Sequence, residues 1–583
     1  MAQVIVIMKR SMSLSFSSHN LKQSFGMIRF HTILFTFFLL SLPFSIRKVL
    51  GVFSPDGSFN EYLDVSLYLS DVLFIAVLIV FILENKKELL SISYWRQMFH
   101  VEHLLLPIFI PALLIFWSGL SILWSESAPL AVVAFFRLIE GYLLYLYILV
   151  CNVPRGTLLN KGGQTDMFHV EHLDDKTQNV PRGTFIDRIL ICISQCSTWN
   201  ILQISLTAII VSGAFQSIAA ILQFIRQKSL GLTFLKESIF SIYDPGVAKV
   251  VISGDVFVRS YGFFPHPNIL GGFLALSLLT TIVYPLIFRS KMFHVEHHIN
   301  VWLYRGIIII QLLALSLSFS KSAILAFVIG LAMVVSGIHK MFHVEHLDDK
   351  TQNVPRGTFQ NSVASQIQKC STWNIYRKSI TSIFNKMFHV EHLIIVWTII
   401  IAGVMLLFIN LKFFIVQPFT ERLFYMSSIK GLYEAYLFEG LGIGQYVFGM
   451  QRFFIDKLLP WQLQPIHNVF LLIFSEIGLV GLVLFLWFLV FVYLRNNKNV
   501  PRGTSTYQNP ECSTWNNSLS SYIKMFHVEQ LFNARQAVIA CLFQSLLTII
   551  IFIMFFDHYF WDIQQGQLLL WIILAFTVSN KKY

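Results

Sequence analysis

The sequence predicts an all-α polytopic membrane protein with about 12 transmembrane helices and two larger extracytoplasmic loops. Hydrophobic residues make up 55% of the 583-residue chain and aromatic residues 15%, including 56 Phe. Apolar runs alternate with polar segments along the chain, and many of the runs approach the roughly 20 residues that a bilayer-spanning helix needs. Lys and Arg gather in every second connecting segment, as they do in the cytoplasmic loops of membrane proteins.

The predicted spans can be placed one after another along the chain. They lie near residues 29–46, 65–84, 104–124, 129–150, 201–225, 268–288, 303–318, 322–338, 393–414, 468–494, 536–556 and 560–578. The chain is predicted to begin with a cytoplasmic segment at 1–28 and four spans at 29–150, followed by a repeat-derived cytoplasmic insertion at 151–200. Four spans at 201–338, with an outer loop at 226–267, precede a second repeat-derived cytoplasmic insertion at 339–392. Two spans at 393–494, with a large outer loop at 415–467, precede a third, repeat-containing cytoplasmic insertion at 495–535, and two spans with the C-terminus complete the chain at 536–583.

Three short peptides recur in the predicted insertions and connecting loops. The word MFHVEH begins at Met98, Met167, Met292, Met341 and Met387, with MFHVEQ at Met525; NVPRGT begins at Asn152, Asn179, Asn353 and Asn499; and CSTWN begins at Cys196, Cys370 and Cys512. The H-x-x-H spacing inside MFHVEH places two imidazoles on one helix face, which is typical of a metal site. One metal site does not explain so many copies.

A shared DNA sequence explains all three peptides. Each can be back-translated to contain the palindrome TGTTCCACGTGGAACA, read in a different frame, and the residue after every copy is compatible with it. We interpret the words as a translated DNA repeat that was copied into the gene in frame. Loops that do no chemistry tolerate such insertions, because lengthening a loop costs only about 0.6 kcal/mol per doubling.

The distribution of charge predicts the orientation in the membrane. The formal net charge of +12 is compatible with nucleic-acid binding, but the basic residues lie mostly between spans, where they indicate membrane orientation instead. The repeat words fall after the second, fourth, sixth, eighth and tenth predicted spans, in the basic loops. We therefore expect both termini and the insertions in the cytoplasm, and functional residues in the outer loops.

Five motifs in the last 330 or so residues resemble, in order, those of the O-antigen ligase and polymerase superfamily. They are RSYGFFPHPNILGGF at Arg259, SFSKSAILAF at Ser318, ERLFYM with GLGIGQY at Glu421 and Gly440, HNVFLLIFSEIGLVG at His467, and DHYFWDIQQGQLLLW at Asp557. This resemblance implies a bacterial cytoplasmic-membrane glycosyltransferase that uses a glycan carried on a polyprenyl diphosphate.

Three residues are predicted to be catalytic. Arg259 and Arg422 suit a diphosphate, because guanidinium groups bind phosphate in a forked geometry and stabilise the leaving group. His467 is the candidate general base that takes the proton of an acceptor hydroxyl. The competing structural readings are a snorkelling Arg259, an ion pair of Arg422 with Glu421, and a helix cap made by His467 with Asn468.

Further residues are predicted to contact substrate. These are His266, Asn268, Lys321, Asn468, Gly442, Gly444, Asp557 and Gln564. Lys321 replaces the Arg that the superfamily often carries in this motif. The competing readings are a rigid turn at PHPN with Asn268 as helix cap, a tight turn at GLGIG, close helix packing at Gly478 and Gly481, and interfacial anchoring of Asp557 and Gln564.

The predicted activity is an O-antigen ligase-like transfer of a glycan from the polyprenyl diphosphate to an acceptor glycan or lipid-linked sugar, outside the cytoplasm. The expected partners are that donor, the acceptor and the lipid bilayer, without nucleic acid, metal or cofactor. One alternative is an O-antigen-type polymerase, which differs in acceptor alone. Another is a polysaccharide-lipid transporter or flippase, and the insertions leave open an inactive product.

Overall fold

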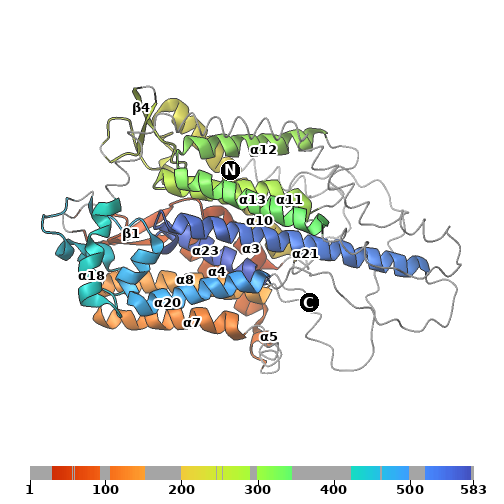
Figure 1. Ribbon diagram of the computed structural model, residues 1–583, viewed down its shortest axis with the longest axis horizontal. Coiled ribbons are helices and arrows are strands. Elements are labelled where there is room, and N and C mark those ends of the chain that lie inside the picture. Colours follow the sequence, from red (N-terminus) through yellow and green to blue (C-terminus); the bar gives the residue numbers. More distant parts are fainter. Residues whose placement is uncertain are drawn as a thin grey trace, which may run out of the picture.

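The computed structural model describes residues 29–91, 105–151, 199–288, 298–343, 422–497 and 519–579, except positions 55, 56, 58, 59, 245, 253, 460 and 461. Within this part of the chain the protein is mostly helical, with two small hairpins (Figure 1). Seven of the described helices are long and apolar enough to cross a membrane. The protein is therefore a multi-pass membrane protein.

The N-terminal half begins with two helices joined by a hairpin. Its elements are α3 (Phe30–Ser41), β1 (Arg47–Val52), β2 (Asp64–Tyr68), α4 (Leu69–Glu84), α5 (Lys86–Leu89), α7 (Leu105–Leu120), η1 (Ser121–Trp124), α8 (Ala128–Cys151), α10 (Trp199–Arg226), η3 (Thr233–Leu235), β3 (Lys249–Ile252) and β4 (Asp255–Val258). The strands pair β1 with β2 and β3 with β4, both antiparallel.

The C-terminal half supplies most of the remaining bundle. Its elements are α11 (Pro267–Ile287), α12 (His298–Leu317), α13 (Lys321–His343), α18 (Ser428–Tyr436), α19 (Tyr446–Gly449), η6 (Met450–Phe453), α20 (Val469–Asn497), α21 (Leu519–Met554), α22 (Tyr559–Asp562) and α23 (Gln564–Ser579). Helices occupy every predicted span except 393–414, which lies outside the described residues. Most of the repeat words of the first two insertions also lie outside them, but Trp199 and Asn200 of one CSTWN copy begin α10, and Met341–His343 of one MFHVEH copy end α13.

Three predicted boundaries were wrong. The span predicted at 65–84 begins as strand β2, whose Asp64-to-Tyr68 sequence alternates polar and apolar residues, so the fold is not purely α. Helix α3 ends at Ser41, shortly before Pro43, which cannot donate to the preceding turn. Helix α21 begins at Leu519 inside the predicted insertion, because MFHVEQ contains good helix formers such as Met, Glu and Gln.

Two helices form the centre of the described bundle. Helix α11 contacts α10, α12, α13 and α21. In its apolar membrane-spanning stretch 89% of the residues are buried, compared with 33% in that of α13. Helix α23, which contacts α8, α20 and α21, is buried along almost its whole length. A helix that is apolar on all sides and enclosed by neighbours is typical of the core of a large membrane bundle.

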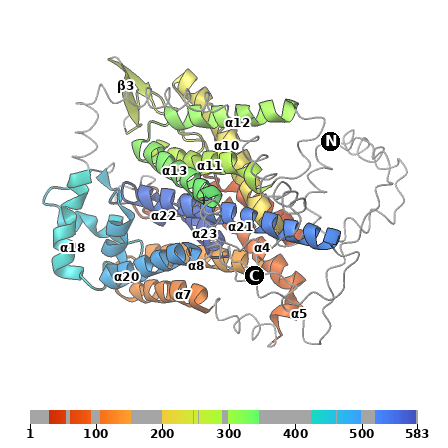
Figure 2. The same cartoon turned by 45° about the vertical axis from the view of Figure 1, so that its right-hand side comes forward.

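Most of the short elements lie at one end of the bundle. Figure 1 shows both hairpins and α18 on the left, near the ends of the long helices, which run roughly side by side, and α18 is again at the left in Figure 2. We call this the hairpin end. The central helices α11 and α23 begin at this end, next to α22, so their N-terminal residues can meet there.

Candidate functional site

The PHPN motif forms the start of α11. His266 is the N-cap: its backbone is extended, and its Nδ1 accepts a hydrogen bond from the backbone nitrogen of Asn268 at 3.2 Å. Pro267 occupies the first helical position, where a missing N–H costs nothing. The competing reading, in which Asn268 caps this helix, is therefore wrong. Because the cap is His266, the Asn268 side chain remains available for a longer-range contact.

Asn268 joins two predicted site residues that are far apart in the sequence. Its Oδ1 accepts a hydrogen bond from Nη2 of Arg259 at 2.7 Å, and its Nδ2 donates to Oδ2 of Asp557 at 2.9 Å. Arg259 follows strand β4, and its Nε donates to the carbonyl oxygen of Ser318 at 2.8 Å. These two bonds use two of the five guanidinium N–H donors, which leaves others for a ligand.

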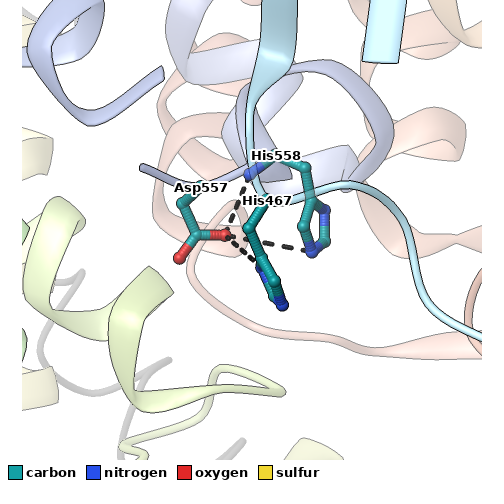
Figure 3. Close-up of side chains that lie close together, drawn as sticks. All are labelled: His467, Asp557 and His558. Carbon is teal, nitrogen blue, oxygen red and sulfur yellow. Dashed lines mark hydrogen bonds and ion pairs between the residues drawn. The ribbon is translucent and has the colours of Figure 1, made fainter. Parts of the chain in front are cut away.

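Asp557 lies at the centre of a cluster with two histidines. Its Oδ1 accepts from the backbone nitrogen of His558 at 2.9 Å and lies 3.9 Å from Nδ1 of His467 and 3.9 Å from Nε2 of His558. Figure 3 shows the three side chains converging from two segments, the entry to α20 and the link between α21 and α22. The two imidazole rings are 5.2 Å apart.

The electrostatic environment gives each of these groups a different state. Burial by itself raises the pKa of Asp557, but the surrounding histidines, His467 foremost, more than offset this and hold it below its ordinary value. Burial lowers the pKa of His558, and the carboxylates of Asp562 and Asp557 outweigh that effect and raise it. Burial lowers the pKa of Arg259 to about 10, so the guanidinium stays charged near neutral pH.

His266 has the opposite character. Burial, followed by the charge of Arg259, lowers its pKa to about 3. A base of this strength holds a proton poorly near neutral pH, and its Nδ1 is already engaged as a cap. Of the two histidines predicted at the site, His467 is therefore the better candidate for proton transfer. Its side chain is 23% exposed, while that of Asp557 is 6% exposed, so a ligand can reach His467.

Arg422 and Asn468 hold the segment that leads into Asp557. Nη2 of Arg422 donates to the carbonyl oxygen of Phe556 at 3.1 Å, and Nδ2 of Asn468 donates to that of Phe555 at 3.1 Å. Asn468 also caps α20, since its Oδ1 accepts from the backbone nitrogen of Leu471 at 3.0 Å. The capping interpretation of Asn468 is thus confirmed, and the Glu421 partner proposed for Arg422 lies outside the described residues.

Lys321 adds a third cation. It begins α13 and lies close enough to Arg259 and to Arg422 for each guanidinium group to repel its ammonium group. The N-termini of α11, α13 and α20 are at this same place, and each contributes the positive end of a helix dipole. The site therefore combines a strongly positive surface with one buried carboxylate.

The predicted glycine and glutamine contacts lie elsewhere. Gln564 is buried, and its Nε2 donates to Asp71 at 2.6 Å and to Glu140 at 2.7 Å inside the bundle. Gly442 and Gly444 both have positive φ, which confirms the tight-turn reading of GLGIG. Gly444 lines a separate small cavity of about 70 Å³ with Tyr62 and Trp561, among others.

Gly478 is not a helix-packing glycine as predicted, because α20 is broken there. Gly478 has φ 70° and ψ −172°, a region essentially restricted to glycine. The freed carbonyl oxygens of residues 475–477 accept hydrogen bonds from the backbone nitrogens of Leu441 and Gly442 and from Nε1 of Trp117, at 2.7–2.9 Å. The turn thus satisfies the polar groups that the break exposes.

Two residues of the cluster, His558 and Asp562, were not predicted. Nδ1 of His558 pairs with Asp562 Oδ1 at 2.9 Å, and the i, i+4 spacing of the two residues was a usable signal within DHYFWDIQQ. Among the described residues, ligand atoms of His467, Asp557 and His558 lie within 4.8 Å of one another, so this triad could hold a divalent cation. No protein-family model matches the chain, and no curated protein matches it either.

Proposed function

We propose that the protein is a membrane glycosyltransferase that resembles O-antigen ligases and polymerases and moves a glycan from a polyprenyl diphosphate to a hydroxyl of an acceptor glycan or lipid-linked sugar. The observation that carries the proposal is the convergence of His467, Asp557 and Arg259 through Asn268. These residues come from three of the motifs on which the family resemblance rests. In this proposal the chain has twelve spans, and the hairpin end faces away from the cytoplasm of a bacterial cell.

The donor diphosphate fits the positive surface. Arg259 offers the N–H groups that Asn268 and Ser318 leave unused, and Arg422 and Lys321 add charge nearby. The helix N-termini favour the same anion. As the bond between the anomeric carbon and the phosphate oxygen breaks, negative charge builds up on the leaving diphosphate, and these groups stabilise it.

The acceptor hydroxyl is activated by His467. Nδ1 of this residue faces Asp557, which directs Nε2 away from the carboxylate and toward the acceptor. The hydroxyl oxygen attacks the anomeric carbon while its proton passes to Nε2, and polyprenyl diphosphate leaves. The carboxylate of Asp557 stabilises the imidazolium that forms, as a buried acid does beside a catalytic histidine. Direct displacement inverts the anomeric carbon.

The decisive experiment measures transfer and donor binding separately. His467→Ala should lower the transfer rate by roughly 10²- to 10⁴-fold with donor affinity nearly unchanged, because the base acts mainly in the transition state. Arg259→Ala should weaken donor binding as well, and Arg259→Lys should restore only part of it, since an ammonium cannot form the fork. Full transfer by His467→Ala would remove the catalytic role of this residue.

The same assay tests the role of metal. Because His467 is needed as a free base, transfer should persist in chelator. Loss of transfer in chelator with recovery on adding Zn²⁺ would instead assign His467, Asp557 and His558 as ligands. Acceptors matched to the source envelope distinguish ligase from polymerase, because a ligase takes a lipid A core and a polymerase takes another lipid-linked repeat unit.

A lipid-linked-glycan transporter is the second candidate, favoured by the break in α20 and by the buried polar groups around it. Broken helices line the substrate sites of many transporters. Here the carbonyl oxygens at the break are bonded to Leu441, Gly442 and Trp117, so the protein itself uses these ligand positions. Movement of the donor across vesicles without glycosidic bond formation would support this candidate over the transferase.

A further inference from the structure

A wide pocket opens at the hairpin end beside the proposed catalytic cluster. It has a volume of about 590 Å³ and lies between strand β1 and the segment around η3. Pockets of roughly 300–1,000 Å³ are the size that holds small ligands. This pocket therefore has room for a short oligosaccharide, and its wall carries four charged residues: Arg47, Lys48, Lys236 and Glu237.

The one carboxylate of the wall is fully engaged by the protein. Glu237 is 5% exposed, and its oxygens accept hydrogen bonds from the backbone nitrogens of Leu230 and Leu232 and from Nε2 of Gln223, at 2.6–2.9 Å. These bonds close the loop before η3. Glu237 therefore stabilises the wall and offers little charge to a ligand.

The wall has one partly buried cation, Arg47, and two exposed ones. Arg47 is paired with Glu61 and also bonded to Tyr68, with only 14% of its side chain exposed, so its charge is largely balanced. Lys48 and Lys236 are exposed. Among the described residues neither lysine forms an ion pair, so the pocket presents a net positive charge.

The wall is connected to the catalytic cluster through the chain segment that carries the PHPN motif. Pro265 lines the pocket and directly precedes His266. Ser45, also in the lining, donates to the carbonyl oxygen of Phe263 at 3.5 Å and accepts from Nε2 of Gln565 at 3.0 Å. A glycan in this pocket would therefore lie next to the segment that holds Asn268 and Arg259.

We propose that this pocket is the acceptor subsite and that it takes an acidic glycan, bearing a carboxylate or phosphate group that Lys48 and Lys236 bind. The acceptor role rests on the proposed function, whereas binding of the acidic glycan can be measured without a donor. The hydroxyls of Thr233 and Ser238 in the lining suit sugar hydroxyls. Val49 and Ile239 offer apolar surface for the carbon face of a sugar ring.

The test is equilibrium binding to the full chain in nanodiscs of uncharged lipid, without donor. The probes are a uronic-acid-containing trisaccharide, a phosphorylated trisaccharide and the matched neutral trisaccharide. At least one acidic probe should bind more tightly than the neutral one. Lys48→Gln combined with Lys236→Gln should weaken binding of that acidic probe roughly tenfold, since the variant removes both exposed cations that would pair with its anionic group.

Lys249→Gln is the matched control, because Lys249 is an exposed lysine of the neighbouring hairpin, lies outside the pocket, and donates from its side chain to the carbonyl oxygen of Asp244. It should leave binding unchanged. Equal binding of acidic and neutral probes, or equal losses in the double variant and the control, would overturn the subsite. Nanodiscs with phosphatidylglycerol test a lipid headgroup: if the double variant alters only retention of this lipid, the glycan proposal is wrong.

Binding and transfer measurements test the acidic-glycan subsite and the transferase activity separately. A wild-type protein that binds the acidic glycan through Lys48 and Lys236 but forms no glycosidic bond would contradict the transferase and retain the subsite. A protein that transfers glycan to a neutral acceptor, and loses no affinity in the double variant, would retain the transferase and remove the subsite.

Discussion

Replacing Asp557 with Asn tests the cluster at its centre. The substitution keeps the shape and an oxygen that can accept from Asn268, but it removes the charge that faces His467. Two unit charges 3.9 Å apart interact by about 4 kcal/mol at an effective dielectric constant of about 20. Since about 1.4 kcal/mol is a factor of ten in rate, complete loss of this stabilisation slows transfer by about 1,000-fold.

Solvent lowers this expectation, because 23% of the His467 side chain is exposed. We therefore expect the kcat of glycan transfer to fall roughly 100- to 1,000-fold in Asp557→Asn, with a small change in KM for the donor, since the charge acts on the imidazolium of the transition state. The assay is single-turnover transfer by purified protein, with radiolabelled or fluorescent donor and saturating acceptor.

A matched control removes a carboxylate of the same type at the same end of the bundle. Asp255 lies at the β3–β4 turn and is exposed, so Asp255→Asn should transfer at the wild-type rate. Thermal unfolding in detergent must accompany both variants, because Asp557 is buried and its loss also affects stability. Wild-type kcat in well-folded Asp557→Asn would refute the electrostatic role assigned to this residue.

Three other predictions concern stability and topology. Gly478→Ala should abolish folding or lower the unfolding temperature strongly, since a Cβ would lie 2.0 Å from the carbonyl oxygen of Phe438. Gly306→Ala is the control and should be tolerated, because a Cβ there would meet nothing within 4 Å. Equal unfolding temperatures of the two variants would contradict the predicted clash at Gly478. Because folding lowers the pKa of Asp557, this carboxylate stabilises the folded state above about pH 4, and the stabilisation is lost as the pH falls toward the pKa of Asp557 in the folded protein. The difference in unfolding temperature between wild type and Asp557→Asn should therefore shrink in acid. A difference that stays constant with pH would count against this. Reporter fusions near Asp244 should report the outside and fusions after Lys291 the cytoplasm, and the reverse result would place the site on the wrong face for an exported donor.

The helices were predictable because their cause is local. A segment of about 20 apolar residues must satisfy its own backbone hydrogen bonds in a bilayer, and only a helix does so within one segment. Hence the sequence located α7, α8, α10 and α11 to within a few residues. Strand β2 escaped prediction, since its partner β1 lies across a connection that hydropathy does not reveal.

The candidate site was only partly predictable. Three sequence motifs identified Arg259, His467 and Asp557 separately. The three residues lie close together in the structure because α11, α20 and α22 begin at the same end of the bundle. Gln564 was misplaced: it follows α22 closely, but the start of α23 turns its side chain inward to Asp71 and Glu140. A side chain's direction depends on the helix that carries it, which spacing alone does not fix.

The sequence by itself determined that the chain crosses a membrane several times, where most of its helices lie, and which polar residues stand near their ends. These follow from hydropathy and from residue chemistry, both of which act over a few neighbouring residues. Only the tertiary structure decided that Asn268 links Arg259 to Asp557, that His558 joins the cluster, and that a turn at Gly442 fills the break at Gly478. Each of these contacts joins residues distant in sequence or depends on side-chain direction, and so is set by how the helices pack.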